Sequence, residues 1–477
     1  MKYAFKTEPY AHQITALQKG WKKTDFGYFM EMGTGKTKVM IDTMAMLYDE
    51  GKLDGVLIIA PKGVYRNWTN KEIPQHMPAH IDTRIATWDA RLTKKIKDEI
   101  NHLYHPNTEL NIMVMNIDAL ITKNGHMVAE KFLLGRNAMM IVDESTIIKN
   151  PGAKRTKATI KLGKLARYRR ILTGSPVTKS PLDVYSQCDF LDPHLLGFSS
   201  YYSFRNRYAV MQDSNFGGKN FKQVVGFRNT DELNDILKEF TYRVTKDECL
   251  DLPDKVFMRR EFDMTPEQKK VYDDMKRTAV AFLEGEGVSA TSVITQLLRL
   301  HQISCGAFPT DDGPVLPIKH DRLKELMSVL DEVRGKSIIW ANYRYDIHAI
   351  KAALDKEFGP EATVTYFGDT SDDDRQRAVE SFQDGSSPVR FFLGNTQTGG
   401  YGITLTEAST VIYYSNNYDL EKRLQSEDRA HRIGQNKSVT YVDLVCRATV
   451  DEKIIKALRD KISMANAVTG DTWKEWI

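Results

Sequence analysis

The chain has 477 residues, of which 41% are hydrophobic and 27% charged, with a formal net charge of +4. It is too long for one hydrophobic core, so two or more domains are expected, and the absence of any run of eighteen apolar residues argues against a membrane span. The N-terminus lacks a secretory apolar core, and the four scattered cysteines show no CxxC spacing, so secretion, a disulfide framework and a zinc site are not expected.

The first predicted elements are a helix, a strand and a glycine-rich turn. A helix is predicted from Pro9 to Trp21, in which no spacing rule assigns a role to Gln13. The short apolar run Tyr28–Met30 then leads into Met32–Thr37 and a helical run over Lys38–Tyr48. Strand, glycine loop and helix in this order are typical of a phosphate-binding loop.

The chemistry of this turn follows from its residue types. Gly33 and Gly35 let backbone N–H groups approach an anion closely, and the next helix directs its positive end at the same anion. Lys36 can reach the outer phosphates, and the Thr37 hydroxyl can bind Mg²⁺. Met30 stands where the full pattern has its first glycine, so an ordinary turn before a helix is the alternative. The predicted nucleotide contacts here are Gly33, Thr34, Gly35, Lys36 and Thr37.

Continuous apolar runs recur through the first half of the chain. Each is typical of a strand buried on both faces of a parallel sheet, and helical stretches lie between them. The runs are Val56–Ala60, Ile112–Met115, Met139–Val142 and Ile171–Leu172. This alternation predicts an α/β domain with a mostly parallel sheet.

Polar residues follow several of these runs directly. In open α/β sheets, ligands bind beyond the carboxyl ends of the strands, so the phosphate loop, Asp143–Glu144 and Thr173–Ser175 are expected to line one crevice. We assign Asp143 to Mg²⁺ and Glu144 to the base that takes a proton from the attacking water. A pair of solvated acids at a helix start is the alternative.

A basic stretch follows the acidic pair. Between Lys149 and Arg170 there are nine Lys or Arg residues and no acid. Such a patch can neutralise the phosphates of a nucleic-acid backbone, whereas a solvated helix face is the competing interpretation.

Residues 186–315 have a different character, since the buried runs disappear. Helical patterns cover Asp231–Phe240, Pro266–Leu283 and Thr291–Ile303, and Gly306–Pro317 is the best candidate for a linker. We therefore expect a first domain over residues 1–185, helical insertions and a linker over 186–315, and a second domain over 316–477.

Buried runs return in the second half and predict a second α/β domain without a phosphate loop. The runs are Ser337–Trp340, Val364–Phe367, Arg390–Leu393, Val411–Tyr414 and Val439–Val442. Gly399, Gly400 and Gly402 follow the run Arg390–Leu393 and can bring the backbone close to a ligand. By themselves they are a weak indication of a binding site.

The stretch 425–435 carries the strongest pattern of the second half. Gln425, Arg429 and Arg432 are spaced to lie on one face of a helix, and Gly434 is expected to end that helix. Paired arginines suit the charge that develops on a transferring phosphoryl group, where an arginine finger contributes about 10³ to 10⁵ in rate. A salt-bridged surface helix is the alternative.

In order and spacing, these motifs resemble the helicase-superfamily-two ATPases of the Swi/Snf (chromatin-remodeller) type. The resemblance covers most of the chain, and its last motif is the most specific. The matching segments are His12–Gln13, Met32–Thr37, Ile59–Lys62 with Asn67–Trp68, Asp143–Thr146, Leu172–Pro176, Tyr242–Lys246 with Leu252–Pro253, Gly399–Ile403, and Arg429–Gln435, which reads RAHRIGQ.

The resemblance implies two RecA-like domains that clamp ATP with Mg²⁺ between the first-domain motifs and the arginines of the second. It implies that Gln13 reads adenine. We place further nucleotide contacts at Gly402 and Gln425. DNA contacts are expected at Lys62, Asn116, Lys149, Thr396 and Gly399.

The chain also departs from the family pattern. Ser145–Thr146 replaces Ala-His, and Tyr418–Leu420 stands where the family has Trp-Asn-Pro. No accessory module is recognised, so we expect a minimal, monomeric motor of a bacterium or virus. It would be cytoplasmic, or nuclear if the source is eukaryotic, and would have no membrane partner.

The predicted function is an ATP-driven motor that translocates on double-stranded DNA without sequence preference, since a grip on phosphates carries no base information. One alternative is a strand-separating DNA or RNA helicase, which would act on forked or single-stranded substrates. The other is a DNA-binding scaffold with a vestigial ATP site.

Overall fold

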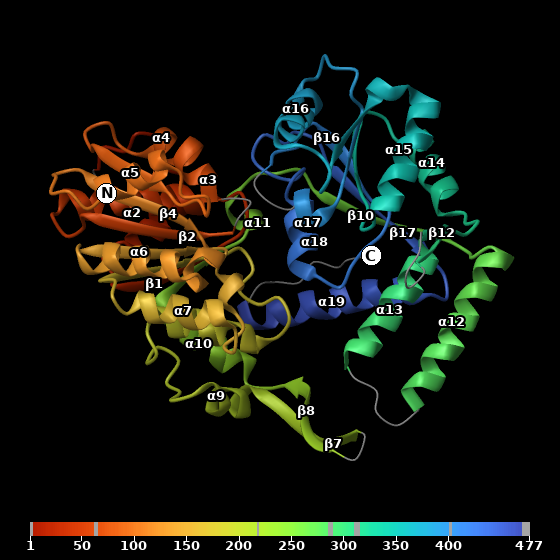
Figure 1. The fold of residues 1–477 in the computed structure, drawn as a ribbon, viewed down its shortest axis with the longest axis horizontal. Coiled ribbons are helices and arrows are strands. Elements are labelled where there is room, and N and C mark those ends of the chain that lie inside the picture. Colours follow the sequence, from red (N-terminus) through yellow and green to blue (C-terminus); the bar gives the residue numbers. More distant parts are fainter. Residues whose placement is uncertain are drawn as a thin grey trace. The chain divides into compact units, whose positions relative to one another are not determined.

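The computed structural model describes residues 3–61, 65–216, 219–284, 290–309, 315–399 and 403–469. The chain divides into two compact units, the first made mainly of residues up to Gln212 with Val224–Asp251, and the second mainly of Leu252–Ile462 (Figure 1). Among the helices within these ranges, none has the length and apolar character that a membrane span requires.

The first unit is built on a seven-stranded sheet in the order β3-β4-β2-β5-β6-β1-β9, in which every strand pair is parallel. Its strands are β1 (Asp25–Met30), β2 (Gly55–Ala60), β3 (Thr83–Thr87), β4 (Leu110–Asn116), β5 (Ala138–Asp143), β6 (Tyr168–Leu172) and β9 (Thr241–Val244). The first four apolar runs of the sequence therefore form strands, as predicted.

Helices cover both faces of this sheet because alternate residues of its strands enter two separate cores. In β2, Val56 and Ile58 pack with α1 (Ala11–Gly20) and α2 (Lys36–Asp49), whereas Leu57 and Ile59 face the opposite core. That second core receives α6 (Lys123–Leu134), α7 (Lys154–Gly163), α8 (Val184–Leu191) and α10 (Thr230–Phe240).

Shorter elements complete the first part of the chain. They are α3 (Tyr65–Asn67), the π-helical η1 (Trp68–Glu72), α4 (Ile73–His76), α5 (Lys94–His102), the 3₁₀ turns η2 (Ile117–Ile121), η3 (Ser145–Ile148) and η4 (Pro181–Asp183), α9 (Tyr201–Tyr208) and α11 (Lys246–Cys249). The strands β7 (Ala209–Phe216) and β8 (Lys219–Phe227) form a separate two-stranded sheet.

The second unit holds a six-stranded sheet in the order β10-β17-β16-β13-β15-β14, and again every pair is parallel. Its strands are β10 (Lys255–Phe262), β13 (Lys336–Trp340), β14 (Thr363–Tyr366), β15 (Phe391–Gly394), β16 (Ala408–Tyr413) and β17 (Val439–Cys446). The predicted fold class, two α/β domains with mostly parallel sheets, is confirmed.

Helices also cover both faces of the second sheet. One core joins α14 (Arg322–Glu332) and α15 (Arg344–Phe358), and the opposite core joins α16 (Asp372–Gln383). The remaining elements are α12 (Pro266–Glu284), α13 (Ala290–Ser304), β11 (Ala307–Pro309), β12 (Val315–Pro317), η5 (Pro360–Ala362), α17 (Thr396–Gly399), α18 (Leu420–Glu427) and α19 (Val450–Thr469).

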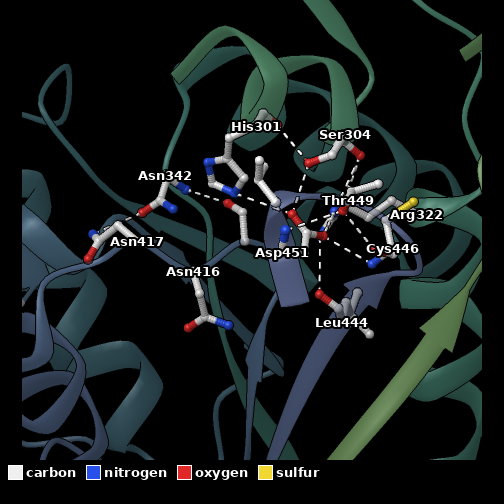
Figure 2. Close-up of polar contacts among 12 residues, drawn as sticks. His301, Ser304, Arg322, Asn342, Asn416, Asn417, Leu444, Cys446, Thr449 and Asp451 are labelled. Atoms are coloured by element: carbon white, nitrogen blue, oxygen red, sulfur yellow. Dashed lines mark hydrogen bonds and ion pairs between the residues drawn. The ribbon is translucent and has the colours of Figure 1, made fainter. Parts of the chain in front are cut away.

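A buried ion pair fastens the helices to the carboxyl ends of this sheet (Figure 2). Arg322 of α14 pairs with Asp451 of α19 and donates to the carbonyl oxygen of Tyr414 at 2.6 Å. Asp451 also accepts from the Ser304 hydroxyl of α13 at 2.9 Å and from the backbone N–H of Cys446 at 3.0 Å. One arginine and one aspartate thus hold three helices against two strands.

The sequence-based division of the middle of the chain needs correction. Residues 186–315 were expected to hold helical insertions and a linker, but β9 pairs with β1 in the first sheet and β10 pairs with β17 in the second. The linker Gly306–Pro317 contains the small β11–β12 ribbon, in the residues that the structure describes. β9 was missed because it has only four residues, and β10 because its side chains alternate in exposure instead of forming an apolar run.

Candidate active site

The residues between β1 and α2 form a tight glycine loop. Gly33 and Gly35 have φ angles of 83° and 87°, a left-handed conformation that favours glycine. A Cβ atom at Gly35 would lie 2.1 Å from the Nε2 atom of Gln13, so a side chain does not fit there. Gly35 is also the N-cap of α2 and provides no side-chain cap, which leaves the first N–H groups of the helix facing an anion site.

Side chains of Lys36 and of α1 contact the backbone carbonyl groups of this loop and of the end of β1. The Lys36 ammonium group donates to the carbonyl oxygens of Met30 at 2.9 Å and Glu31 at 3.4 Å, and its side chain is buried. His12 Nε2 and Gln13 Nε2 lie 2.7 Å and 3.1 Å from the carbonyl oxygen of Thr34. The predicted adenine-reading residue therefore lies against the predicted phosphate loop.

The acidic pair lies at the carboxyl end of β5. Asp143 accepts from the Trp68 indole N–H at 2.9 Å and from the Glu144 backbone N–H at 3.0 Å. Burial raises the pKa of Asp143, while the Trp68 hydrogen bond and the charge of Lys36 act in the opposite direction. Because β1, β6 and β5 run parallel, the loop that follows β1 and the acidic pair at the end of β5 share one edge of the sheet.

Glu144 has an unusual backbone. Its φ and ψ angles are 49° and 61°, in the left-handed region that non-glycine residues seldom adopt. Such strain persists only where the surroundings impose it, and it is common at functional sites. The Glu144 side chain is half-buried and directly follows Asp143.

The polar segment that follows β6 packs against the glycine loop through Gly174. A Cβ atom at Gly174 would approach the backbone nitrogen of Met32 to 3.1 Å, so this glycine allows the two segments to touch. Arg243 of β9 donates to the carbonyl oxygens of both Phe29 and Gly174 at 2.9 Å. The backbone N–H of Lys246, the first residue of α11, donates to the Glu31 carboxylate at 2.8 Å. The segment from β9 to α11 therefore holds the start of the loop through hydrogen bonds.

In the second unit, the predicted helix is shorter than expected. α18 ends at Glu427 instead of continuing to Gly434, so Gln425, Arg429 and Arg432 do not share one helical face. The Arg429 guanidinium donates to the Gln425 carbonyl oxygen at 2.7 Å, and the next backbone N–H groups bond three or four residues back, in irregular turns. Gly434 has a left-handed φ of 101°, but it closes a later turn.

The two arginines nevertheless come together. Arg429 and Arg432 both donate to the carbonyl oxygen of Ile403, at 3.2 Å and 3.4 Å. Gln425 contributes a buried side-chain oxygen that has no hydrogen-bond partner within the described residues. The structure thus gathers three predicted site residues beside position 403, although not by the helical spacing that was expected.

Family models match both halves of this chain. The model described as the SNF2-related domain matches residues 28–308, more than half of the sequence. The chain belongs to the SNF2-related family. The helicase conserved C-terminal domain matches residues 318–434. These residues contain the strands β13 to β16 together with Arg429 and Arg432.

Relatives of this SNF2-related chain come from eukaryotes and bacteria. The "Chromatin structure-remodeling complex subunit snf21" of Schizosaccharomyces pombe is 26% identical over 92% of this chain and 37% of its own length. The "Putative ATP-dependent helicase/translocase YwqA" of Bacillus subtilis is 26% identical over 92% of this chain and 46% of its own. The chain therefore spans less than half the length of these curated relatives.

A solved structure is also similar. The "Sulfolobus solfataricus SWI2/SNF2 ATPase core in complex with dsDNA" has 24% sequence identity and a TM-score of 0.43, over 98% of this chain and 96% of that chain.

In the segment Asp143–Thr146 of this SNF2-related chain, Ser145 stands where the family pattern has Ala. The Ser145 hydroxyl donates to the Gln187 side-chain oxygen at 2.6 Å, and both residues are fully buried. Gln187 in turn donates to the carbonyl oxygens of Pro176 and Asp183 at 2.8 Å. The substitution at 145 therefore links this segment to the one that follows β6.

The predicted DNA contacts have mixed surroundings. Lys62 lies outside the described residues, as does Gly402, which was predicted to contact the nucleotide. Asn116 caps η2 by accepting the Ala119 N–H at 3.1 Å, and Lys149 donates to the Thr178 hydroxyl at 2.6 Å, so both already have structural partners. Thr396 and Gly399 begin and end α17, and the Thr396 hydroxyl is buried with no partner within the described residues.

Three residues that the sequence did not single out take part in these arrangements. Trp68 and Arg243 appeared only within the family resemblance, and no spacing rule joins Arg243 to a loop more than two hundred residues away. Asn342, which follows β13, has a buried Nδ2 atom without a partner among the described residues, and its Oδ1 accepts from Asn417 at 3.4 Å (Figure 2). The rule that found Asp143, a polar residue directly after a buried strand, would also have found Asn342.

Proposed function

We propose that this chain is an ATP-driven motor that translocates on double-stranded DNA. The observation that carries the proposal is the buried Lys36 in a glycine loop after β1, at the same edge of the parallel sheet as Asp143 at the end of β5. Family membership and the printed names of the relatives, a chromatin-remodelling subunit and a helicase or translocase, support the DNA substrate.

Each residue of the first unit then has a defined task. The loop N–H groups and Lys36 bind the phosphates, since charged phosphate oxygens are stronger acceptors than the carbonyls that Lys36 contacts. Glu144 takes a proton from the water that attacks the γ-phosphorus, while the bond to the leaving β-phosphate oxygen breaks. Arg429 and Arg432 neutralise the charge that moves to the leaving oxygen.

The residues present also suit Mg²⁺. Thr37 and Asp143 offer a hydroxyl and a carboxylate oxygen, and Mg²⁺ usually takes one or two such protein ligands together with substrate phosphates. When bound, Mg²⁺ draws charge from the phosphate oxygens. Asp143 is prepared for this by its hydrogen bond to Trp68, which fixes the carboxylate plane.

The test compares ATP hydrolysis with and without duplex DNA at low salt. We expect duplex DNA to raise kcat, Lys36→Ala to abolish turnover, and DNA binding by Lys36→Ala to remain. Lys52→Ala, at an exposed lysine beyond the other end of α2, is the matched control and should behave as the unmutated protein. No stimulation by duplex DNA would end the motor hypothesis, and unmeasurable turnover in the unmutated protein would favour the scaffold alternative.

One observation favours the strand-separating alternative enough to test it. The β7–β8 ribbon is a separate two-stranded sheet, and a ribbon of this kind can act as a wedge between strands. A triplex-displacement assay beside a strand-displacement assay distinguishes the two. Release of the third strand without separation of the duplex indicates translocation, and separation of the duplex indicates a helicase.

A further inference from the structure

Positive charge in this chain is concentrated in one stretch. Residues 145–182 contain ten Lys or Arg residues and no Asp or Glu, so the other 439 residues hold 57 cationic and 63 acidic side chains. The small positive net charge of the whole chain therefore arises from this stretch alone.

Four of these ten cations lie on α7 (Figure 1). Thr156, Thr159 and Leu162 are buried against the unit, whereas Lys154, Arg155, Lys157 and Lys161 are exposed. At about 100° per residue, the three lysines lie within about 60° of one another around the helix axis. Within the described residues, none of these four cations forms an ion pair.

Some other exposed cations of the first unit have acidic partners, whereas others, such as Lys94 and Lys97 of α5, form no ion pair within the described residues. Arg66 pairs with Asp89, and Arg207 pairs with Glu232. What distinguishes the α7 cations is that they lie in a stretch of sequence that contains no acidic residue.

The electrostatics of α7 oppose the stability of the free helix. Lys157 lies three residues from Lys154 and four from Lys161, spacings at which like charges repel. Lys154 and Arg155 stand in the first turn, at the positive end of the helix dipole, which contains no acid, and Ala153 provides no side-chain cap. An anion along this face would relieve all of these effects, and such local conflicts are expected at functional surfaces.

We propose that the outer face of α7 binds the phosphate backbone of the DNA on which the motor acts. The identity of the polyanion rests on the proposed function. The three lysines extend over about 10 Å of the helix axis, a length over which duplex DNA carries about six phosphate charges. The Thr156 hydroxyl, on the buried side of α7, donates to the Ile148 carbonyl oxygen at 3.3 Å. The helix therefore begins close to the segment Asp143–Thr146, and its outer face would extend the DNA contact beyond the motif loops.

The test uses a double charge reversal in the full chain, Lys154→Glu with Lys161→Glu. The matched control, Lys94→Glu with Lys97→Glu, makes the same change at exposed lysines of α5. Duplex affinity is measured by fluorescence anisotropy over a range of salt concentrations. We expect the α7 variant to lose affinity by at least about tenfold and its salt slope to fall by about 2, with little change in the control.

In the absence of DNA, the full chain with the α7 double charge reversal should also be more stable than the unmutated protein. Both repulsive pairs become attractive and an acid enters the first turn. These gains outweigh the loss of the Lys161 cation from the last turn, so we expect a rise in Tm of about 2 °C. Loss of DNA affinity together with a gain in stability is the result that a merely structural surface would not produce.

Several results would overturn the inference. They are an unchanged affinity and slope, an equal loss in the α5 control, a lower Tm, or loss of polyglutamate binding with DNA affinity intact, which would assign the face to an acidic polypeptide. The proposed function is judged separately, by ATP hydrolysis. If DNA fails to stimulate the unmutated protein while the α7 variant still loses DNA affinity, the motor hypothesis fails and this inference stands.

Discussion

A single glycine decides the shape of the phosphate loop. Gly35 combines a left-handed backbone with contact to Gln13, so an added methyl group would meet both a backbone penalty and a collision. Gly51, just after α2, has a similar φ of 64°, but a Cβ atom added there would have no neighbour within 4 Å. A comparison of alanine substitutions at the two glycines therefore separates the effect of left-handed backbone strain, which both share, from the effect of the contact with Gln13, which only Gly35 has.

We expect Gly35→Ala to raise the KM for ATP by at least about tenfold, because the methyl group displaces Gln13 or the loop. Gly51→Ala should leave KM unchanged. Each substitution should lower the free energy of unfolding by about 1–2 kcal/mol through left-handed strain. Steady-state kinetics and urea unfolding measure the two effects. Equal KM values for both variants would contradict the importance of the contact between Gly35 and Gln13.

The Ser145–Gln187 hydrogen bond gives a second prediction at this scale. Ser145→Ala leaves the buried Gln187 oxygen without its donor, which should cost about 1–3 kcal/mol of unfolding free energy. It should also lower kcat more than it changes KM, because residue 145 adjoins Glu144. The control is Ser186→Ala, since the Ser186 hydroxyl is fully buried with no partner among the described residues.

Chemical denaturation of the two alanine variants measures this difference. Ser186→Ala should be neutral or stabilising, because it removes an unsatisfied buried group. If both serine variants lose the same stability, the hydrogen bond to Gln187 contributes nothing of its own.

At the scale of elements, continuous apolar runs were a reliable guide and alternating or short segments were not. All runs predicted as strands lie within observed strands or overlap them, because both faces of these strands are buried by helices. The edge strand β3 was missed because its side chains are mostly half-exposed. The end of α18 was misplaced because Arg429 binds a helix carbonyl, a competition that spacing cannot reveal.

The helix α2 carries a pH-dependent prediction. Lys38 and Asp42 form a buried pair at 2.7 Å, yet burial raises the pKa of Asp42 from 3.8 to about 6 despite Lys38. The folded chain therefore binds the proton more tightly than the unfolded chain. Between about pH 4 and pH 6 the Asp42 contribution to the free energy of unfolding should fall as pH rises, by about 2–3 kcal/mol in total.

Asp42→Asn removes this titration and isolates it from other groups. The stability difference between the unmutated protein and Asp42→Asn, measured by urea unfolding, should change across this window in favour of the variant at higher pH. A difference that stays constant from pH 4 to pH 7 would show that Asp42 titrates as it does in an unfolded chain.

At the scale of the whole molecule, the order of the motifs predicted the family and the two parallel sheets, whereas the boundaries between domains could not be predicted. β9 and β10 lie ten residues apart in the chain and join different sheets. Nothing in their composition tells which sheet each joins, because the register is set by backbone partners distant in sequence. Among the site residues, those next to glycine or at strand ends were predictable, and those that act through long-range hydrogen bonds, such as Arg243, were not.

The proposed mechanism also makes a prediction for mixtures of variants. One variant carries Lys36→Ala, and the other carries both Arg429→Ala and Arg432→Ala. If Lys36 and the two arginines act within one chain, an equimolar mixture of these two variants should show no DNA-stimulated hydrolysis. Each variant alone should be equally inactive, because transition-state charge is stabilised from both sets of residues. Recovery of activity on mixing would show that one copy supplies its arginines to another.

The place of β9 in the first sheet has a consequence for biosynthesis. The strand that supports the phosphate loop is made about seventy residues after β6, the preceding strand of that sheet. While the ribosome is translating the intervening segment, the emerging polypeptide holds an incomplete sheet with β1 exposed along one edge. The hydrogen bonds that Arg243 and Lys246 make to Phe29 and Glu31 can therefore form only after residues 241–246 have left the exit tunnel, and chaperones that shield open sheet edges would act in that interval.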